Sequence, residues 1–321
     1  LKISEGCDHQ CTFCAIPSFR GAHVSKPLER VLEEARMLAD QGVREVCLIA
    51  QDSTQYGYDL CGEPLLPRLL ADLSAISSLR WLRVFYCYPS RVNDRLIRAI
   101  AETPKVCQYL DMPLQHADPG ILRAMRRPGD GASYLRLIER IREASPDVAL
   151  RTTFIVGFPG ETEEQFAALE RFVEAARFDR VGVFEYSVEE GTPSASLPGR
   201  VPARIKRQRR DRLMRLQQAI SLERGRRWIG RTMEVLVEQS RVHGVTGRTF
   251  RDGPDVDGQV HVAGSRARPG DFIQARITGA QPYDLEGTAA AVAESLNGCR
   301  AGGRPSLSEA DLGPCSPADS R

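Results

Sequence analysis

The sequence predicts an α/β fold, an open (β/α)6 partial TIM barrel, followed by a small antiparallel β-barrel. Three observations predict it. Strand-like and helix-like stretches alternate six times up to residue 191, the composition then turns rich in Pro, Gly and Ser, and period-two alternation returns over 228–290. Strand–helix alternation demands a parallel sheet with right-handed crossovers. Short strands between Gly, Asp and Pro turns favour an antiparallel barrel of oligonucleotide-binding (OB) type.

The elements of the first region follow from periodicity. The expected strands are 1–4, 43–50, 80–87, 105–112, 148–156 and 180–187. The expected helices are 28–41, 64–77, 91–102, 118–126, 132–144 and 161–176. Helix ends carry physical markers, since Pro119 enters the fourth helix and Thr162 suits a helix N-terminus.

The chain divides into four expected segments. They are an α/β core over 1–200, a basic linker helix over 201–227, the small barrel over 228–290 and a disordered tail over 291–321. The length allows a substantial core and more than one domain.

The composition excludes several classes of protein. Hydrophobic residues make up 42% and charged residues 27%, as in ordinary globular proteins. The longest apolar runs are too short to span a bilayer, and no secretory signal opens the chain. We therefore expect a cytoplasmic protein that is not associated with a membrane. The chain starts at Leu1 inside an expected strand, which suggests a missing piece upstream.

Three cysteines stand close together in the stretch EGCDHQCTFC at 5–14. Cys7, Cys11 and Cys14 are spaced CxxxCxxC, and Phe13 directly precedes the third. The odd total of nine argues against a complete disulfide framework. The remaining six have no metal-like spacing, and we expect buried or free thiols: Cys47, Cys61, Cys87, Cys107, Cys299 and Cys315.

An incidental turn and a zinc site are the plain alternatives for the triplet. Zinc would want a fourth Cys or His at a fixed distance, and no second CxxC or HxxxH partner follows. His9, between the first two cysteines, would need a strained chelate. Three thiolates make sense if one metal position must stay open. In a cubane 4Fe–4S cluster, three cysteines hold three irons and the fourth iron takes a small ligand.

The CxxxCxxC spacing with Phe13 resembles the signature of the radical S-adenosylmethionine (SAM) enzymes. The resemblance implies that the open iron chelates SAM and that one electron cleaves SAM to methionine and a 5′-deoxyadenosyl radical. We therefore predict one 4Fe–4S cluster in this chain, held by Cys7, Cys11 and Cys14, with SAM as the second cofactor.

Polar residues and glycines cluster where the expected strands end, which is where barrel enzymes carry their active sites. For any single one of them, a turn or a satisfied polar group is the plain alternative. Ile155 is more often a core residue than an adenine contact, and His116 is a proton donor or a turn residue. The predicted SAM contacts are Gln51, Asp52, Gln115, Ile155, Gly157 and Glu161.

Several long motifs, in order over residues 1–290, resemble the RimO family of radical-SAM methylthiotransferases. They are KISEGCDHQCTFCAIPSFRG, IAQDSTQYG, LDMPLQHADPGILRAMRRPG, TTFIVGFPGETEEQF, YSVEEGTPSASLP and RITGAQPYDLEG, the last in a barrel that resembles a TRAM domain. The resemblance implies methylthio transfer to the β-carbon of an aspartate in ribosomal protein S-twelve. The implied partners are that protein or the small ribosomal subunit, reached through the TRAM-like domain, and an electron donor such as flavodoxin.

The family also carries an N-terminal domain with three more cysteines and a second cluster, thought to handle sulfur. No such segment precedes Leu1, so we expect radical SAM chemistry from this chain and complete methylthio transfer only with that domain attached. The implied sequence is methylation of a sulfur by one SAM, then hydrogen abstraction from the aspartate after cleavage of a second SAM.

Two other functions stay open. One is the MiaB-like tRNA methylthiotransferase, which acts on a modified adenosine. The other is a non-catalytic binding module with a structural cluster, against which the three-thiolate site argues, because a structural cluster is normally closed by a fourth ligand. Four details favour the RimO branch: Gln51–Asp52 with Tyr56–Gly57, VEEGTP, AMRRPG at 124–129, and the charge of the barrel.

Charge differs between the linker helix and the barrel. From Arg200 to Arg231, twelve Lys and Arg stand against two acidic residues, which fits either a solvated basic face or a surface for RNA phosphates. From Thr232 to Ala290, six arginines stand against eight acidic residues, a net charge of −2. We expect such a barrel to suit a cationic protein, with Asp255 and Asp257 in an exposed loop.

Overall fold

The computed structural model describes residues 1–290. The expected disordered tail, with Cys299 and Cys315, lies outside the described residues. Within 1–290, no helix is both long and apolar enough to cross a membrane.

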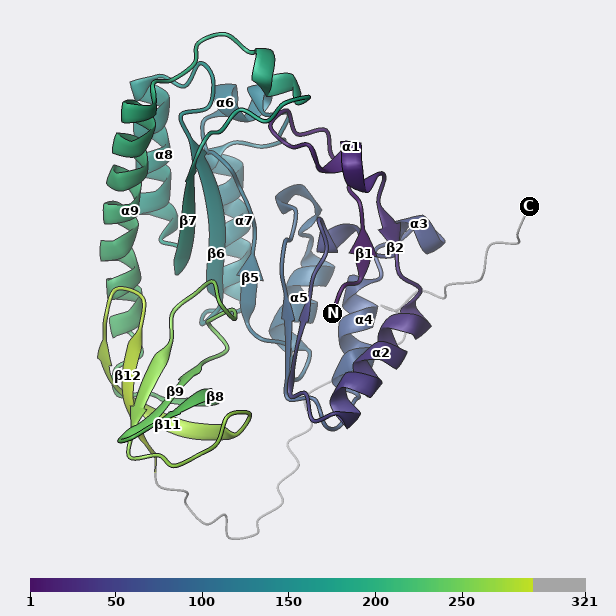
Figure 1. Cartoon of the computed structure of the whole chain (residues 1–321), viewed down its shortest axis with the longest axis vertical. Helices are drawn as coiled ribbons and strands as arrows, with labels where there is room; N and C mark the ends of the chain where they lie inside the picture. Colours follow the sequence, from purple (N-terminus) through teal and green to yellow (C-terminus); the bar gives the residue numbers. More distant parts are fainter. Residues whose placement is uncertain (291–321) are drawn as a thin grey trace, which may run out of the picture.

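A curved parallel sheet forms the first domain, as predicted (Figure 1). Its strands are β3 (Glu45–Leu48), β4 (Trp81–Val84), β5 (Tyr109–Asp111), β6 (Ala149–Val156) and β7 (Arg180–Glu185). β3 pairs with β4, and β5 with β6 and β7, all in parallel. Single parallel bridges, Leu82 to Val106 and Lys2 to Ile49, join the two halves and add the N-terminal segment at one edge. The order of neighbours along the sheet is therefore the order along the chain.

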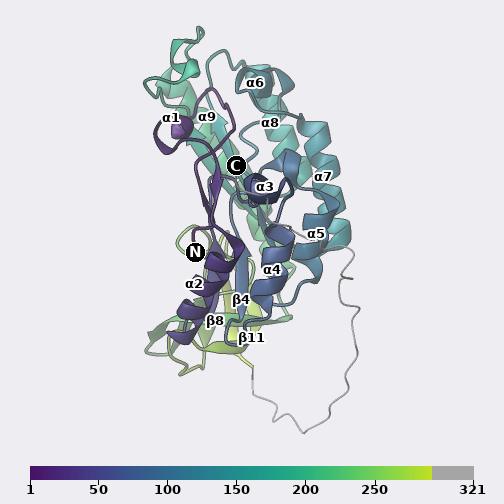
Figure 2. The same cartoon turned by 90° about the vertical axis from the view of Figure 1, so that its right-hand side faces the viewer.

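Helices cover the outer face of this sheet, and Figure 2 shows α4, α5, α7 and α8 side by side. The helices of the first domain are α1 (Ile16–Arg20), α2 (Leu28–Asp40), α3 (Tyr58–Cys61), α4 (Leu66–Ser74), α5 (Asp94–Glu102), α6 (Pro119–Ala124), α7 (Gly131–Ala144) and α8 (Glu163–Ala176). One continuous core of leucine, isoleucine, valine and phenylalanine lies between helices and sheet. Burial of this apolar surface is the main stabilising contribution.

Local sequence sets the helix starts. Thr162 accepts a hydrogen bond from the Gln165 amide and Gln165 bonds back, a capping box at the start of α8. Asp118 caps α6 in front of Pro119, and Asn93 caps α5.

The sequence left several short elements unpredicted. A two-residue ladder joins β1 (Ser4–Glu5) to β2 (Val24–Ser25) antiparallel and closes the loop that carries the cysteines. Short 3-10 turns follow three strands, at Ser53–Gln55, Pro89–Arg91 and Pro193–Ser196. Elements of two to four residues have too little periodicity to be seen in a sequence.

The second domain is a closed five-stranded barrel. Its strands are β8 (Thr232–Arg241), β9 (Gly244–Arg248), β10 (Val260–Ala263), β11 (Phe272–Ala280) and β12 (Leu285–Ala289), in the order β10-β12-β11-β8-β9. Four pairings are antiparallel and that of β10 with β12 is parallel, so the predicted small antiparallel barrel is confirmed with one parallel pair. Closure of an OB-type barrel brings its third and fifth strands together in the same direction.

Helix α9 (Ala203–Arg226) leads from the first domain to the barrel, alongside β7 and α8 (Figure 1). The barrel docks at the end of the sheet where the strands begin. Apolar contacts there include Trp81 and Tyr109, the first residues of β4 and β5, with Leu236 and Phe272 of the barrel.

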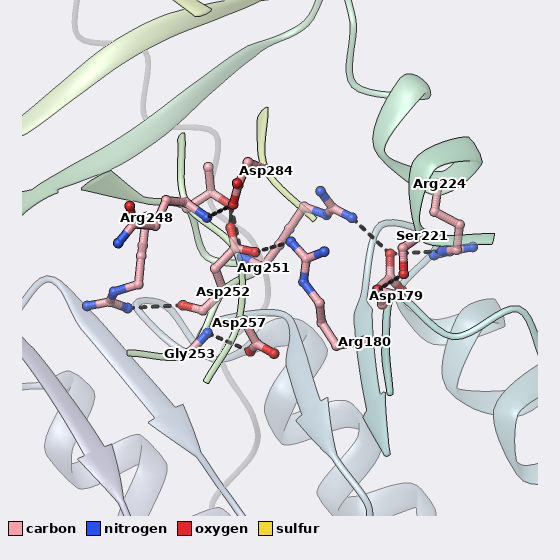
Figure 3. A network of polar contacts seen from close by, with 12 residues as sticks. Asp179, Arg180, Ser221, Arg224, Arg248, Arg251, Asp252, Gly253, Asp257 and Asp284 are labelled. Atoms are coloured by element: carbon pink, nitrogen blue, oxygen red, sulfur yellow. Dashed lines mark hydrogen bonds and ion pairs between the residues drawn. The ribbon is translucent and has the colours of Figure 1, made fainter. Parts of the chain in front are cut away.

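A buried polar network crosses this junction (Figure 3). Asp179, just before β7, accepts hydrogen bonds from Arg224 of α9 (2.8 Å) and Arg251 of the barrel (3.0 Å). The next residue, Arg180, pairs with Asp252 at 2.5 Å. Burial alone would raise the pKa of Asp179, but Arg251 and Arg224 outweigh it and hold that pKa below its ordinary value.

A second part of the junction lies under β3 and β4. Glu45 accepts from Arg83 at 2.9 Å and from Arg248 of the barrel at 2.6 Å. Arg83 is fully buried and also donates to the Phe250 carbonyl at 2.7 Å. The junction therefore satisfies its buried charges with charge-assisted hydrogen bonds.

Candidate functional site

The three cysteines lie on the loop between β1 and α1. Gly6 opens this loop with φ of +77°, and a Cβ there would lie 2.0 Å from the Ala22 carbonyl oxygen. Only glycine fits such a position. The Cys7 amide then donates to the Gly21 carbonyl at 3.1 Å, which draws the two ends of the loop together.

Distant segments hold the middle of the loop. The Thr12 amide and hydroxyl donate to the carbonyls of Met125 and Ala124, at 3.1 and 2.8 Å. The Ser194 amide donates to the Thr12 carbonyl at 2.9 Å. Asp8 accepts from the His23 amide at 2.9 Å and from the Gln55 side chain. These hydrogen bonds therefore tie the loop to three distant segments of the first domain.

The three thiols line one cavity of about 380 Å³ at the end of the sheet where the strands finish. Aromatic side chains from the loop and from two strand ends form its walls: Phe13, Tyr86, Tyr88 and Phe184. The polar lining, beside the thiols, comes from His9, Gln51, Gln115, Arg127, Arg151 and Thr153. A mostly apolar cavity with a few polar groups is typical of a cofactor site.

The thiols suit an iron–sulfur cluster better than a single ion. Within residues 1–290, no three His, Cys, Asp or Glu side chains gather around one point as a lone metal ion requires. A cubane cluster instead spreads its thiolates over different irons. Burial raises the pKa of Cys7 to about 11 and also raises that of Cys14, so binding of iron must displace their protons. Arg127 Nη1 lies 3.9 Å from the Cys11 sulfur and adds a positive charge there.

His9 is engaged elsewhere, although it lines the same cavity. Its Nε2 lies 2.7 Å from Asp52, and its ring stacks on Tyr88 with 3.6 Å between centroids. These contacts agree with the sequence argument against His9 as a fourth ligand. Cys87, three residues after β4, also lines the cavity but is fully buried. Sequence spacing gave no sign of this fourth thiol.

Gln51 and Gln115 lie where the sequence predicted SAM contacts. Both line the cavity, and the Oε1 atom of each is buried without a hydrogen-bond partner in residues 1–290. Gln115 has φ of +74°, a strained conformation that its backbone bonds to Thr153 and Ile155 stabilise. Buried orphan acceptors in a cavity indicate a ligand that donates hydrogen bonds, as the ammonium, amine and hydroxyl groups of SAM do.

Asp52 and Ile155 are not among the residues that line the cavity. Asp52 is buried, accepts from the Thr54 amide at 2.9 Å and holds His9. Ile155 packs beside Phe13 in a small apolar cluster with Phe158 and Tyr186. Their side chains support the cysteine loop.

Gly157 and Glu161 are occupied by contacts with each other and with α9. Glu161 accepts from the Gly157 amide at 2.7 Å and from Arg209 at 2.8 Å. Burial raises the pKa of Glu161 to about 7, against the opposing charge of Arg209. Gly157 has φ of +72°, and a Cβ there would meet Lys206 at 2.4 Å. The close approach that the sequence suggested at this glycine is therefore to Lys206, and no ligand is needed to explain it.

His116 is also buried in this region. Its Nδ1 accepts the Asp118 amide at 3.0 Å, and its Nε2 lies 3.7 Å from Glu161. Burial lowers the pKa of His116 to about 4, so the ring is neutral at pH 7. This arrangement agrees with the turn-residue alternative.

Several arginines of helix α9 form ion pairs with carboxylates of the first domain. Arg209 binds Glu161, Arg212 binds Glu170 at 2.6 Å, and Arg210 binds Glu185 at 2.7 Å. The sequence left two interpretations of this basic helix, a solvated face and a surface for RNA phosphates. The ion pairs with the first domain account for part of the positive charge on which both interpretations were based.

The junction likewise uses charges of the barrel. Asp257 was expected in an exposed loop, but its side chain is 2% exposed and accepts from Tyr109 Oη at 2.7 Å. Five charged residues of the barrel form ion pairs with the first domain: Asp257, Glu234, Asp252, Arg248 and Arg251. The other five acidic residues and four arginines of the barrel take no part in this junction. The net charge of −2 counted over the whole barrel therefore does not describe the charge of its free surface.

The cysteine loop at the carboxyl ends of a (β/α)6 sheet defines the site of a radical SAM enzyme. The chain belongs to the Radical SAM superfamily, whose family model matches residues 1–173, and residues 229–290 match the TRAM domain.

The chain is similar to proteins named ribosomal protein uS12 methylthiotransferase RimO. It is 49% identical over 291 residues to that of Desulforamulus reducens, covering 89% of this chain and 66% of the relative. It is 48% identical over 295 residues to that of Symbiobacterium thermophilum, covering 90% and 61%. For Geobacter sulfurreducens the identity is 50% over 290 residues, covering 89% and 65%. The chain thus spans less than two thirds of these relatives' length.

Solved structures share the fold at low identity. The radical S-adenosylmethionine methyltransferase TsrM from Kitasatospora setae matches with a TM-score of 0.51 and 18% identity, over 61% of this chain and 38% of that chain. Coproporphyrinogen III oxidase HemN from Escherichia coli matches with a TM-score of 0.50 and 15% identity, over 70% and 52%.

Proposed function

We propose that this chain is the radical SAM and TRAM part of a uS12 methylthiotransferase, which adds a methylthio group to the β-carbon of an aspartate in ribosomal protein uS12. The observation that carries this proposal is the cavity, in which three thiols from one loop face orphan amide oxygens and two arginines. The similarity to the RimO proteins supports it.

Cys7, Cys11 and Cys14 are the proposed ligands of one 4Fe–4S cluster. When bound, the cluster supplies the electron that cleaves SAM and so begins radical chemistry. Gln51 and Gln115 are the proposed SAM contacts, because their free oxygens can accept from its donors. Asp52, Ile155, Gly157 and Glu161 act indirectly, by fixing the loop and the turn after β6.

The residues of this chain also prepare the site. Arg127 adds positive charge beside the thiolates and donates to the Pro113 carbonyl, which fixes its position. Phe13, Tyr88 and Phe184 present apolar surface to the cavity.

The remaining parts of the proposal come from the resemblance. They are a second cluster on an N-terminal domain, a flavodoxin-like electron donor, binding of uS12 or the small ribosomal subunit through the TRAM domain, and a cytoplasmic location. The barrel docks at the sheet end opposite the cysteine loop (Figure 1), so a substrate that binds both must be large enough to reach from one to the other.

The test is anaerobic reconstitution followed by mass spectrometry of uS12 and of tRNA. The chain is assayed alone and joined to the N-terminal domain of a full-length relative. We expect the joined protein to add a methylthio group to an aspartate of uS12, and the chain alone to leave both substrates unmodified. Modification of tRNA by the joined protein, with uS12 unchanged, would contradict the proposal and favour the MiaB-like alternative.

A further inference from the structure

The inner face of β6 carries two polar side chains that the sequence left without a role. Arg151 and Thr153 alternate with buried Leu150, Thr152 and Phe154, so they lie on the cavity side of the strand. Both line the cavity that contains the cysteines.

Arg151 is fixed from behind by two carboxylates. Its Nη1 donates to Asp111 at 2.9 Å, and its Nε lies 3.4 Å from Asp257 of the barrel. The two carboxylates have other donors as well, the Tyr86 amide for Asp111 and the Tyr109 hydroxyl for Asp257. Arg151 Nη2 has no hydrogen-bond partner in residues 1–290, and neither has the Thr153 hydroxyl. A rigid guanidinium with one free N–H edge therefore borders the cavity.

The cavity lining offers donors for an anionic ligand, although Asp111 and Asp257 offset the charge of Arg151 from behind. Among residues 1–290, the lining contains Arg127 and Arg151 and no aspartate or glutamate. Arg127 belongs to the cysteine end, since it lies beside Cys11 and 4.2 Å above the Tyr88 ring centroid. SAM brings one carboxylate to that end. Arg151 is left for a second anion.

We propose that Arg151, with Thr153 beside it, binds the side-chain carboxylate of the substrate aspartate. This inference rests on the proposed function and adds the residue that selects the substrate. Arginine forms charge-assisted hydrogen bonds with carboxylates, and here the free Nη2 group supplies one donor and the Thr153 hydroxyl a second. A substrate without a carboxylate, such as an adenosine, would give the Nη2 donor no charged acceptor, which disfavours it.

The test measures discrimination between aspartate and asparagine. The reconstituted chain 1–321 with SAM is titrated against labelled uS12 that carries Asp or Asn at the position identified by the mass spectrometry above, and binding is followed by fluorescence anisotropy. We expect the wild-type chain to bind the Asp form roughly 10- to 100-fold more tightly. In Arg151→Gln, this ratio should fall to about 1.

Arg180→Gln is the matched control, because it also removes a buried arginine that binds a barrel aspartate, but its side chain does not line the cavity. It should keep the wild-type ratio. Arg151→Lys guards against misfolding, since it keeps the charge and should keep part of the preference. Equal binding of both forms by the wild type, or an unchanged ratio in Arg151→Gln, would overturn this inference alone. A wild-type chain that binds neither form would contradict the proposed function as well.

Discussion

The two ends of the parallel sheet hold their polar side chains in opposite ways. Where the strands begin, Asp179, Arg224 and Arg251 pair with one another across the domain junction. Where the strands finish, Gln51 and Gln115 border a cavity with oxygens that have no partner in residues 1–290. A closed network stabilises the fold, whereas an open set of polar groups needs a ligand.

This difference separates stability from function along one sheet. In barrel enzymes the carboxyl ends of the strands carry the chemistry and the opposite end carries stability. Arg151 connects the two ends, because it lines the cavity and also binds Asp257 of the barrel. The TRAM domain thereby contacts, through Asp257, a residue that lines the cysteine cavity.

The largest expected effect is at the cysteine loop. Cys7→Ala, Cys11→Ala or Cys14→Ala should each abolish the cluster absorbance, because each removes one of the three proposed iron ligands. Iron quantitation after anaerobic reconstitution checks this. Cys47→Ala and Cys61→Ala are the controls and should retain full iron content.

Cys87→Ala sharpens the same result, since Cys87 is a further thiol in the cavity lining. We expect the cluster to survive this change. Loss of iron in Cys87→Ala would indicate a cluster closed by four thiolates and would favour the non-catalytic binding module.

At the opposite end, Asp179→Ala should destabilise the chain by about 3–5 kcal/mol, because it leaves Arg224 and Arg251 buried without their partner. Urea unfolding followed by tryptophan fluorescence measures it, since both tryptophans, Trp81 and Trp228, lie near the junction. Asp147→Ala, which breaks the more exposed pair with Arg231, should cost about 0–1 kcal/mol. If Asp179→Ala and Asp147→Ala lowered the free energy of unfolding equally, the distinction between the buried network and the exposed ion pair would be contradicted.

Gln115→Leu should affect ligand binding and not stability, in contrast to Asp179→Ala. It removes an unpaired buried oxygen, so the free energy of unfolding should change little. SAM affinity should fall about 5-fold, because one neutral hydrogen bond contributes about 1 kcal/mol. Isothermal titration with SAM on the reconstituted protein measures this, and an unchanged affinity would remove Gln115 from the proposed contacts.

The smallest expected effect is a loss of folding stability at acidic pH. The pKa values of Asp179, Asp252 and Glu45 are held below their ordinary range by arginines that outweigh the effect of burial. Their stabilisation is present above the unfolded pKa values, about 4, and is lost as pH falls through the depressed ones. Tryptophan fluorescence of the cluster-free chain should therefore stay constant down to about pH 4 and change below it. A transition near pH 6 would contradict this.

The sequence predicted what depends on short spacing and on period. Three cysteines within eight positions define the loop chemistry locally, and alternating strands and helices define the sheet. Arg127 and Arg151 were not predicted as parts of one cavity, because only tertiary contacts bring the segment after α6 and the inner face of β6 to the cysteine loop.

Loop exposure was the least predictable feature. Asp257 lies among turn residues, which normally indicates solvent, yet Tyr109 from β5 covers it. The basic composition of α9 was equally ambiguous, because a sequence does not show that Glu161, Glu170 and Glu185 lie opposite its arginines.

The most direct measurement is release of 5′-deoxyadenosine from SAM by the reconstituted chain 1–321, with dithionite as reductant. We expect release by the wild-type chain and by Asp147→Ala, and none by Cys11→Ala, because cleavage needs only the loop and cavity of the first domain. Absence of 5′-deoxyadenosine from a wild-type chain that holds its full iron content, or release by Cys11→Ala, would contradict this expectation.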